Sequence, residues 1–245
     1  MKEDWFKNWF ASKYYLKIYK HRDEVEAYNL VNLIQRTTDF STKVKVLDIG
    51  CGCGRHSLEF AKRGYDVTGF DLSSFLILRA KEQITTLNEK NIKVRFLVKD
   101  MREFNFRGRY DIVINVFSSF GYFKSDEENF RVFRNAFYSL KRKGFFVFDF
   151  LNSRYVRKNL VTQTILYIDG IKIIQKRRIE DGFVFKDIVI GEKVFFERIK
   201  LYNRIELINA LSNSGFKIIK IFGDYYGGRF SEENSERMII FAMKW

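Results

Sequence analysis

The sequence contains no proline, only two cysteines and only two histidines. The cysteines, Cys51 and Cys53, are too close along the chain for a useful structural disulfide. With His21 and His56 they would supply one zinc site only if all four were used, and no standard ligand spacing is present, so we expect no metal. A cluster held by four thiolates is excluded.

Long apolar runs and a secretion signal are also missing. The longest apolar run near the end of the chain, Met238 to Met243, is six residues, far short of the ~18 that span a membrane. Lys2, Glu3 and Asp4 directly precede Trp5, which is not the pattern of a signal peptide. We therefore expect a cytoplasmic protein without a membrane partner.

The composition that remains is typical of a soluble globular protein. Its 245 residues are 46% hydrophobic and 30% charged, which favours a single domain over 1–245, as a monomer or a homodimer. The formal net charge is +14, and residues 153–220 hold half of that surplus. A basic face there could bind an anionic substrate or a nucleic acid, or it could be an ordinary solvated surface.

Apolar strands and helices alternate through most of the chain. Buried strands are predicted at 44–49, 67–70, 92–98, 111–117, 145–151, 216–222 and 237–243. Helices are predicted at 55–63, 73–88, 126–141 and 203–214. This order predicts an α/β fold with a mostly parallel sheet and helices on both faces.

Two segments depart from this alternation. In residues 1–43, aromatic residues such as Trp5 and Trp9 recur at helical spacing, and a second helix is predicted from 22 or 23 to 36. In residues 153–202, strand-like runs are separated by Asp-Gly pairs, which favour hairpin turns. We predict an N-terminal helical cap over 1–43 and an antiparallel β lid of three or four strands over 153–202.

A glycine-rich loop follows the first predicted strand and precedes a helix. It reads D-x-G-x-G-x-G from Asp48 to Gly54, and glycines there let the backbone approach a ligand closely. Asp71, at the end of the next strand, is placed to accept hydrogen bonds from both ribose hydroxyls of a nucleoside. A dinucleotide motif would need glycine at Arg55, and Asp48 suits a cationic sulfonium ligand better than a pyrophosphate.

Four segments carry a resemblance to a known family. They are VLDIGCGCGRHS (46–57), VTGFDLS (67–73), KDMREF (99–104) and YDIVINVFSSFGYF (110–123). In order, spacing and strand context they resemble the class I S-adenosylmethionine-dependent methyltransferases. The whole chain is most similar to the small-molecule branch, including sugar N,N-dimethyltransferases and glycine-type N-methyltransferases, and to a broad bacterial group of unassigned substrate. The resemblance implies a Rossmann-like seven-stranded sheet and S-adenosylmethionine as cofactor; Cys53 departs from the usual small hydroxyl residue.

The resemblance also implies roles for individual residues. Those expected to border the methionine part of the cofactor are Asp48, Gly50, Cys51, Gly52 and Gly54. Those expected at its ribose, adenine and outer cleft are Asp71, Leu72, Asp100, Met101, Val116 and Phe117. Tyr15, Tyr19 and Arg22 would close over the methionine carboxylate, an anion that a guanidinium binds in a fork.

Several of these residues have an alternative structural interpretation. Asp100 could cap a turn, and Met101 could fill the core. Tyr15 and Tyr19 are four residues apart and could form one packed helix face.

Residues that could bind the acceptor follow the fourth and fifth predicted strands, at the carboxyl edge where such folds bind ligands. They are Ser118, Ser119, Tyr122 and Asn152, with helix capping or core packing as the alternative for the serines. Arg237 begins the last strand and could anchor an anionic acceptor or form an ordinary ion pair. Asp149 lies inside a strand with no readable partner, and neither histidine is assigned as a base, so no catalytic residue is predicted.

The predicted function is transfer of a methyl group from S-adenosylmethionine to a small molecule by in-line displacement. Nitrogen is the expected acceptor atom and oxygen the second choice; the basic lid favours an anionic acceptor. The lack of proline excludes the [N/D/S]-P-P-[Y/F] motif of many enzymes that methylate exocyclic base amines. Both cysteines lie in the glycine loop, which argues against the cysteine nucleophile of C5-pyrimidine enzymes.

Two alternatives stay open. An RNA-modifying enzyme would use the basic residues Lys176, Arg177, Arg178 and Arg198. Strand periodicity places Lys176 and Arg178 on one face and Arg177 on the other, so no single basic stripe is evident. A module that binds a nucleoside without catalysis is the second alternative, against which the intact loop and acids argue.

Overall fold

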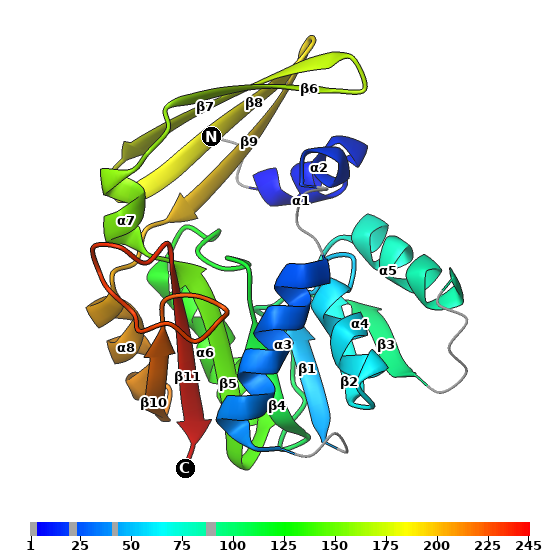
Figure 1. Cartoon of the computed structure of the whole chain (residues 1–245), viewed down its shortest axis with the longest axis vertical. Helices are drawn as coiled ribbons and strands as arrows, with labels where there is room; N and C mark the ends of the chain where they lie inside the picture. The colour runs from blue at the N-terminus through cyan, green and yellow to red at the C-terminus, as the bar shows by residue number, and fades with distance from the viewer. Residues whose placement is uncertain (1–3, 20–23, 41–43, 87–91) are drawn as a thin grey trace.

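The computed structural model describes residues 4–19, 24–40, 44–86 and 92–245. The strands of its larger sheet are β1 (Lys45–Ile49), β2 (Asp66–Asp71), β3 (Lys93–Val98), β4 (Tyr110–Asn115), β5 (Leu140–Leu151), β10 (Phe216–Phe222) and β11 (Arg237–Lys244). They lie in the order β10-β11-β5-β4-β1-β2-β3, as Figure 1 shows. The first five strands pair in parallel, whereas β11 is antiparallel to both β5 and β10. The predicted Rossmann-like α/β fold is confirmed.

Helices cover both faces of this sheet because alternate residues of each buried strand point to opposite sides. On one face, α3 (Glu24–Thr38) and α4 (Arg55–Lys62) pack on strand residues such as Val46, Ile112 and Val147. On the other, α6 (Asp126–Ser139) and α8 (Arg204–Asn213) pack on residues such as Leu47 and Phe148. α5 (Ser74–Thr86) lies beside β2 and β3. The near-continuous apolar runs of the central strands therefore reflect burial on two sides.

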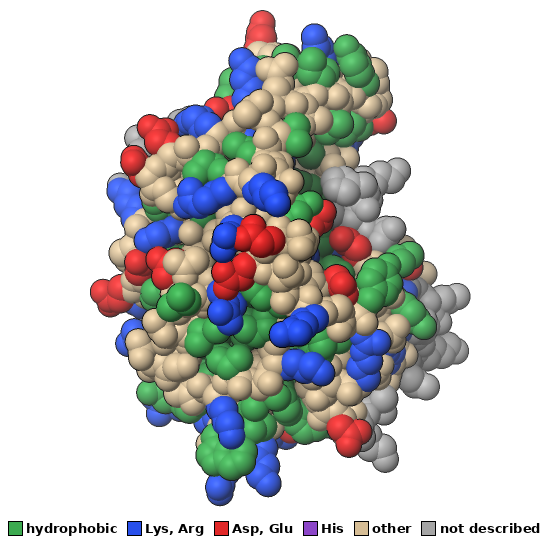
Figure 2. All heavy atoms as spheres, turned by 60° about the vertical axis from the view of Figure 1, so that its left-hand side comes forward, with side chains coloured by type: hydrophobic (Ala, Val, Ile, Leu, Met, Phe, Trp, Pro, Cys, Tyr) green, Lys and Arg blue, Asp and Glu red, His purple; other side chains and the backbone are tan. Residues whose placement is uncertain are grey.

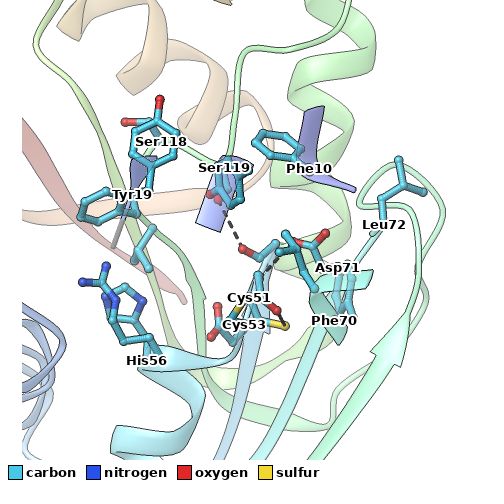
Figure 3. Close-up of a pocket in the computed structure, with 18 of the residues that line it drawn as sticks. Phe10, Tyr19, Cys51, Cys53, His56, Phe70, Asp71, Leu72, Ser118 and Ser119 are labelled. Atoms are coloured by element: carbon cyan, nitrogen blue, oxygen red, sulfur yellow. Dashed lines mark hydrogen bonds between the residues drawn. The ribbon is translucent and has the colours of Figure 1, made fainter. Parts of the chain in front are cut away.

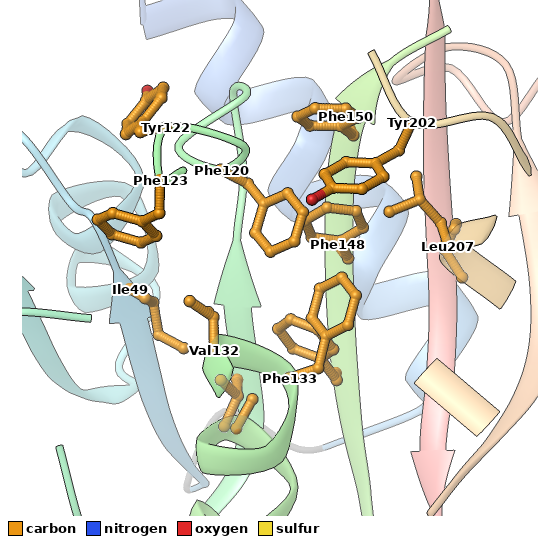
Figure 4. Packing of buried hydrophobic residues seen from close by; sticks show 14 of the residues in the cluster. Ile49, Phe120, Tyr122, Phe123, Val132, Phe133, Phe148, Phe150, Tyr202 and Leu207 are labelled. Carbon is orange, nitrogen blue, oxygen red and sulfur yellow. The ribbon is translucent and has the colours of Figure 1, made fainter. Parts of the chain in front are cut away.

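A cluster of aromatic rings fixes the loop that follows β4. Phe120 of this loop stacks on Phe133 of α6 with 4.8 Å between ring centroids, and it meets Phe148 of β5 edge-on at 5.0 Å. Phe150 and Tyr202 close the same cluster, as Figure 4 shows. Aromatic pairs add about 0.5–1.5 kcal/mol each beyond area burial. The loop at the carboxyl edge is therefore anchored in the core.

The junction between α6 and β5 differs from the prediction. The helix ends at Ser139, two residues before the predicted end, and β5 begins at Leu140, five residues before the predicted start. The pairing with β4 is irregular here, since Tyr110 faces Leu140 but Ile112 already faces Phe145. Gly144 therefore lies inside a longer strand, next to this irregularity.

The segments at 1–43 and 153–202 supply the remaining elements. α1 (Trp5–Phe10) and α2 (Lys13–Ile18) are separated by Ser12, whose hydroxyl accepts a hydrogen bond from the Tyr14 N–H at 3.2 Å. The smaller, antiparallel sheet has the order β6 (Gln163–Ile168), β7 (Ile171–Glu180), β8 (Phe183–Ile190) and β9 (Lys193–Lys200). A short helix that was not predicted, α7 (Ser153–Lys158), precedes it.

The predicted hairpin turns of the smaller sheet are confirmed. Asp169 and Gly170 have φ of 51° and 75°, and Asp181 and Gly182 have 47° and 78°. Two successive left-handed residues are what a two-residue hairpin turn of the favoured twist requires. α1 packs against β9, so the smaller sheet and the N-terminal helices meet above the carboxyl edge of the larger sheet, as Figure 1 shows. No helix within the described residues is long and apolar enough to cross a membrane.

Candidate active site

A cavity of about 890 Å³ lies at the carboxyl ends of β1, β2 and β4, with α1 and β9 on its other side. The structure brings most of the predicted site residues together there. Those that line it are Tyr15, Tyr19, Asp48, Gly50, Cys51, Gly52, Asp71, Leu72, Asp100, Met101, Val116, Phe117, Ser118, Ser119, Tyr122 and Arg237. Arg22 lies outside the described residues.

The glycines of the loop play different parts. A Cβ built on Gly52, which has φ +55°, would meet no atom within 4 Å, so the space beside it is open to a ligand. A Cβ on Gly54 would come within 2.4 Å of the Phe96 ring. Gly54 does not line the cavity, and the structure therefore gives it a packing role between helix and strand in place of the predicted cofactor contact.

Asp71 ties the end of β2 to the glycine loop. One carboxylate oxygen accepts a hydrogen bond from the Gly52 N–H at 3.0 Å, and the other accepts from the Ser73 N–H at 2.8 Å. Burial raises the pKa of Asp71, and these backbone bonds oppose the rise. A carboxylate has about four acceptor sites, so the Asp71 side chain can accept a further hydrogen bond. The carboxylate lines the cavity beside the open space at Gly52 and so fits a ribose. Figure 3 shows Asp71 among the residues that line the cavity.

Asp48 carries less negative charge than its position in the loop motif predicts. It is 1% exposed, and this burial raises its pKa to about 7, although the Ser57 hydroxyl donates a hydrogen bond to it at 2.6 Å. The nearby Asp71 charge raises the pKa further. Near neutral pH a substantial fraction of Asp48 is therefore protonated.

Asp100 lines the cavity and also closes a turn. Its carboxylate accepts a hydrogen bond from the Arg102 N–H at 2.8 Å and pairs with the Arg102 guanidinium at 2.7 Å. Burial acts to raise the pKa of Asp100, but the bonds from Arg102 outweigh it and the pKa is lowered. Met101, half-buried, packs against the larger core cluster. Asp100 therefore closes a turn and Met101 packs in the core, as the alternative interpretation predicted, and both residues also line the cavity.

The backbone after β4 is strained. Phe117 and Ser118 have φ of +62° and +61°, which non-glycine residues adopt at a cost of about 1–2 kcal/mol each. The Phe117 N–H donates to the Asp149 carboxylate at 2.9 Å, and the Ser118 N–H donates to the Asp149 carbonyl at 3.3 Å. This turn sits on the cavity wall.

Arg237 supports the same turn. Its Nε donates to the Asp149 carboxylate at 2.6 Å and one terminal nitrogen donates to the Ser118 hydroxyl at 3.0 Å. The Tyr225 hydroxyl donates to the same carboxylate at 2.7 Å, and Asp149 is fully buried. Of the two predictions for Arg237, the structure favours the ion pair over an anchor for the acceptor.

Asn152 and Tyr122 take structural positions. The Asn152 side chain caps α7 and donates to three carbonyls of the loop before β11, outside the cavity lining. This arrangement replaces its predicted role at the acceptor. The Tyr122 hydroxyl donates to the Ser118 carbonyl at 2.9 Å, while its ring stacks on Phe6 on the cavity wall.

The opposite wall, which we call the roof, joins α1 and α2 to β9. The roof residues that line the cavity are Trp5, Phe6, Phe10, Tyr15, Tyr19 and Glu197, and Trp9, Phe195 and Phe196 pack behind them. Glu197 accepts hydrogen bonds from the Trp9 indole N–H and the Tyr19 hydroxyl, both at 2.6 Å, and Lys186 donates to the Tyr19 hydroxyl at 2.6 Å. Sequence reasoning missed Glu197, because its partners lie 178 and 188 residues away and no local pattern marks it.

The basic residues of the insertion do not face the cavity. Of residues 153–202, those that line it are Glu197 and Ile199. Arg178 pairs with Asp187 at 2.7 Å, and Arg198 donates to the Tyr122 carbonyl at 3.2 Å. On the face in Figure 2, Lys and Arg side chains are interspersed with acidic and hydrophobic ones.

Residues 46–144 match the family described as methyltransferase domain. YqeM of Bacillus subtilis, which carries the name of a methyltransferase, is 33% identical over 44% of this chain and 42% of its own. The dTDP-3-amino-3,4,6-trideoxy-alpha-D-glucopyranose N,N-dimethyltransferase of Streptomyces venezuelae is 30% identical over 42% of this chain and 40% of its own. These two alignments reach less than half of each relative.

A solved structure extends the similarity to the whole fold. The crystal structure of an S-adenosylmethionine-dependent methyltransferase from Clostridium acetobutylicum has a TM-score of 0.80 and 18% identity, and covers 96% of this chain and 98% of its own. The predicted methyltransferase domain is therefore confirmed for residues 46–144, and the whole chain shares the fold of a solved S-adenosylmethionine-dependent methyltransferase.

Proposed function

We propose that this protein transfers a methyl group from S-adenosylmethionine to a small-molecule acceptor at nitrogen, with oxygen as the second choice. The observation that carries the proposal is the pairing of Asp71 with the Gly52 N–H beside open space in a cavity of about 890 Å³. A volume of this size is typical of small-molecule sites. The sugar N,N-dimethyltransferase similarity supports nitrogen as the acceptor atom.

The residues of the chain would divide the work between binding and orientation. When bound, the cofactor supplies an activated methyl group on a good, neutral leaving group. Asp71 would hold the ribose, Asp100 and Met101 the adenine side, and the glycine loop the methionine part. The roof would orient the acceptor nitrogen in line with the methyl group and exclude water, which is the main catalytic task in such a displacement.

We further propose that the roof acts as a lid, formed by the N-terminal helices and the 153–202 insertion. The prediction of an anionic acceptor depended on basic lid residues, whereas the lid offers the cavity Glu197, Ile199 and aromatic rings. An acceptor with an apolar face and an amine fits these groups better. The cytoplasmic location and the oligomeric state stay predictions.

RNA is the second candidate acceptor, and the placement of the basic residues does not favour it. Lys176 and Arg178 lie on one face of the smaller sheet and Arg177 on the other, as their pairing with β8 requires. Arg198 is 9% exposed and stacks on Phe183. An RNA-binding surface would need several free cations on one face.

The test is transfer of labelled methyl from S-adenosylmethionine into host extract, separated by filtration into small and large molecules. We expect label in the filtrate with the wild type and none with Asp71→Ala. The matched control is Asp66→Asn, at the other end of β2 and outside the cavity lining. Label retained with macromolecules would contradict the small-molecule proposal, and nuclease treatment would then identify RNA.

Binding is measured separately by calorimetry. Loss of the Asp71 hydrogen bonds should weaken S-adenosylmethionine binding by roughly 5- to 150-fold, since buried bonds left unmade cost about 1–3 kcal/mol. Equal affinity of wild type and Asp71→Ala would show that the cofactor site is assigned wrongly.

A further inference from the structure

His56 is a buried polar side chain that the proposed function does not use. It is the second residue of α4, is 6% exposed, and lines the cavity beside the glycine loop, as Figure 3 shows. Its Nε2 is buried and has no hydrogen-bond partner among the residues that the structure describes. A buried polar atom left unpaired costs about 1–3 kcal/mol, so such a group on a cavity wall indicates a missing ligand.

The imidazole is neutral in this environment. Burial lowers the pKa of His56 well below its usual value, and the charges of Arg55 and Arg237 lower it further. A neutral imidazole presents one N–H donor and one nitrogen acceptor. It is a weak proton acceptor at neutral pH, so binding suits it better than general-base catalysis.

The surroundings of His56 favour an anion. The two guanidinium groups lie 4.9 Å (Arg55) and 5.1 Å (Arg237) from the centroid of the Phe117 ring, which itself is 6.4 Å from the imidazole. α4 has no side-chain cap and no acidic residue in its first turn, and the carboxylate that Ser57 of this turn binds, Asp48, is partly protonated near neutral pH, so it offsets the positive end of the helix dipole only in part. Arg55 pairs with Glu26 and Arg237 with Asp149, yet both raise the local potential enough to disfavour imidazolium.

The order of the strands gives the direction of the bound cofactor. Neighbouring strands run β3, β2, β1, β4, and their carboxyl ends carry Asp100, Asp71, the glycine loop and Phe117 in that order. With adenine near Asp100 and ribose at Asp71, as proposed above, the amino-acid part would lie over the glycine loop, toward Phe117 and His56. Its carboxylate is the anionic group of this ligand.

We propose that His56 donates a hydrogen bond to the carboxylate of the methionine part of the cofactor. This inference rests on the proposed function, since it concerns the same cavity. It assigns to the start of α4 a role that the family resemblance implies for Tyr15, Tyr19 and Arg22. The described Tyr19 hydroxyl is engaged by Glu197 and Lys186 in the roof.

The experiment compares two ligands that differ only in the carboxylate, S-adenosylmethionine and its decarboxylated form. Calorimetric affinities are measured for wild type, His56→Phe, His56→Gln and Asp71→Ala. We expect His56→Phe to weaken S-adenosylmethionine binding about tenfold or more and to leave the decarboxylated ligand unchanged within twofold. His56→Gln, which keeps a side-chain N–H donor, should recover much of the loss.

Asp71→Ala is the matched control, because it should weaken both ligands equally through the ribose. Equal weakening of both ligands by His56→Phe would overturn the inference and make His56 a packing residue. Unchanged binding of both would overturn it as well. If the wild type binds neither ligand, the proposed function itself fails, and Asp71→Ala would then show no effect. If circular dichroism shows that His56→Phe does not fold, the two ligands are compared with His56→Gln and His56→Asn instead. The loss of S-adenosylmethionine affinity should then be larger for the variant whose amide reaches the carboxylate less well.

Discussion

The two walls of the cavity are built in different ways. The floor, formed by residues 48–57, 71, 100–101 and 116–119 with Asp149 and Arg237, consists of short segments at the carboxyl ends of strands and the network beneath them. It holds buried charges and left-handed backbone, as in Asp48 and Phe117. The roof consists of aromatic rings and one acid, Glu197, contributed by two segments far apart in the chain.

The two walls are therefore stabilised by different interactions. The floor keeps its shape through polar networks that hold a strained turn, and such networks are costly to break in part. The roof is held by ring packing and by hydrogen bonds at the edge of the cavity, each worth about 1 kcal/mol. Single substitutions should therefore be more damaging in the floor than in the roof.

The largest effect is expected from Asp149→Ala in the floor. Its removal leaves Arg237 without its partner and the Phe117 N–H without an acceptor, so the free energy of unfolding should fall by about 3–5 kcal/mol. Urea denaturation measures the loss, and the double variant Asp149→Ala with Arg237→Met should recover part of it. A loss below about 1 kcal/mol would contradict the view that this network holds the floor.

Substitutions at two glycines of the floor should affect stability and cofactor binding differently. Gly54→Ala should lower the unfolding free energy by about 2–4 kcal/mol, because its methyl group would overlap the Phe96 ring in a left-handed backbone. Gly52→Ala should cost only about 1 kcal/mol of stability, yet place a methyl group in the cavity and weaken cofactor binding. Thermal melts and calorimetry test both, and the reverse pattern would mean that Gly54, not Gly52, borders the ligand.

Asp48 should make the floor sensitive to pH. Because the native pKa is raised to about 7, the native state binds one more proton than the unfolded chain between roughly pH 4 and pH 7, and stability falls as pH rises through that window. Asp48→Asn removes the contribution of this carboxyl group to the pH dependence of stability. Its stability relative to wild type should grow by about 2 kcal/mol from pH 5 to pH 7 in denaturation curves. A constant difference would show that Asp48 ionises normally.

The smallest effect is expected in the roof, from Tyr19→Phe. Loss of the hydroxyl that joins Glu197 and Lys186 should cost about 1 kcal/mol of stability. Affinity for the cofactor, measured by calorimetry, should change less than twofold. A tenfold loss would instead support the role at the methionine carboxylate that the family resemblance implies.

Most of the larger sheet could be read from the sequence because its signals are local. Apolar runs such as 44–49 and 67–70 are buried on both faces. Asp-Gly dipeptides mark the hairpin turns of the smaller sheet. The end of α6 could not be read, since the irregular pairing of β5 with β4 is a property of two strands together. α7 is six residues long and has too little periodicity to stand out.

The same division applies to the site. Gly52 and Asp71 belong to contiguous motifs, so their placement on one cavity wall follows from the strand ends that carry them. Asn152 and Gly54 lie at comparable strand ends but turn to helix capping and to packing, because neighbouring loops and Phe96 occupy the space. Spacing alone does not distinguish these cases.

The fold class, the glycine loop and the acid at the end of β2 follow from the sequence alone, since they depend on backbone geometry and on residues close in the chain. Which charges are buried and paired depends on the folded chain. The raised pKa of Asp48, the Asp149–Arg237 pair, the buried Nε2 of His56 and the contact of Glu197 with Trp9 all arise between distant segments. Desolvation and ion pairing depend on what the fold brings near, which no local pattern encodes.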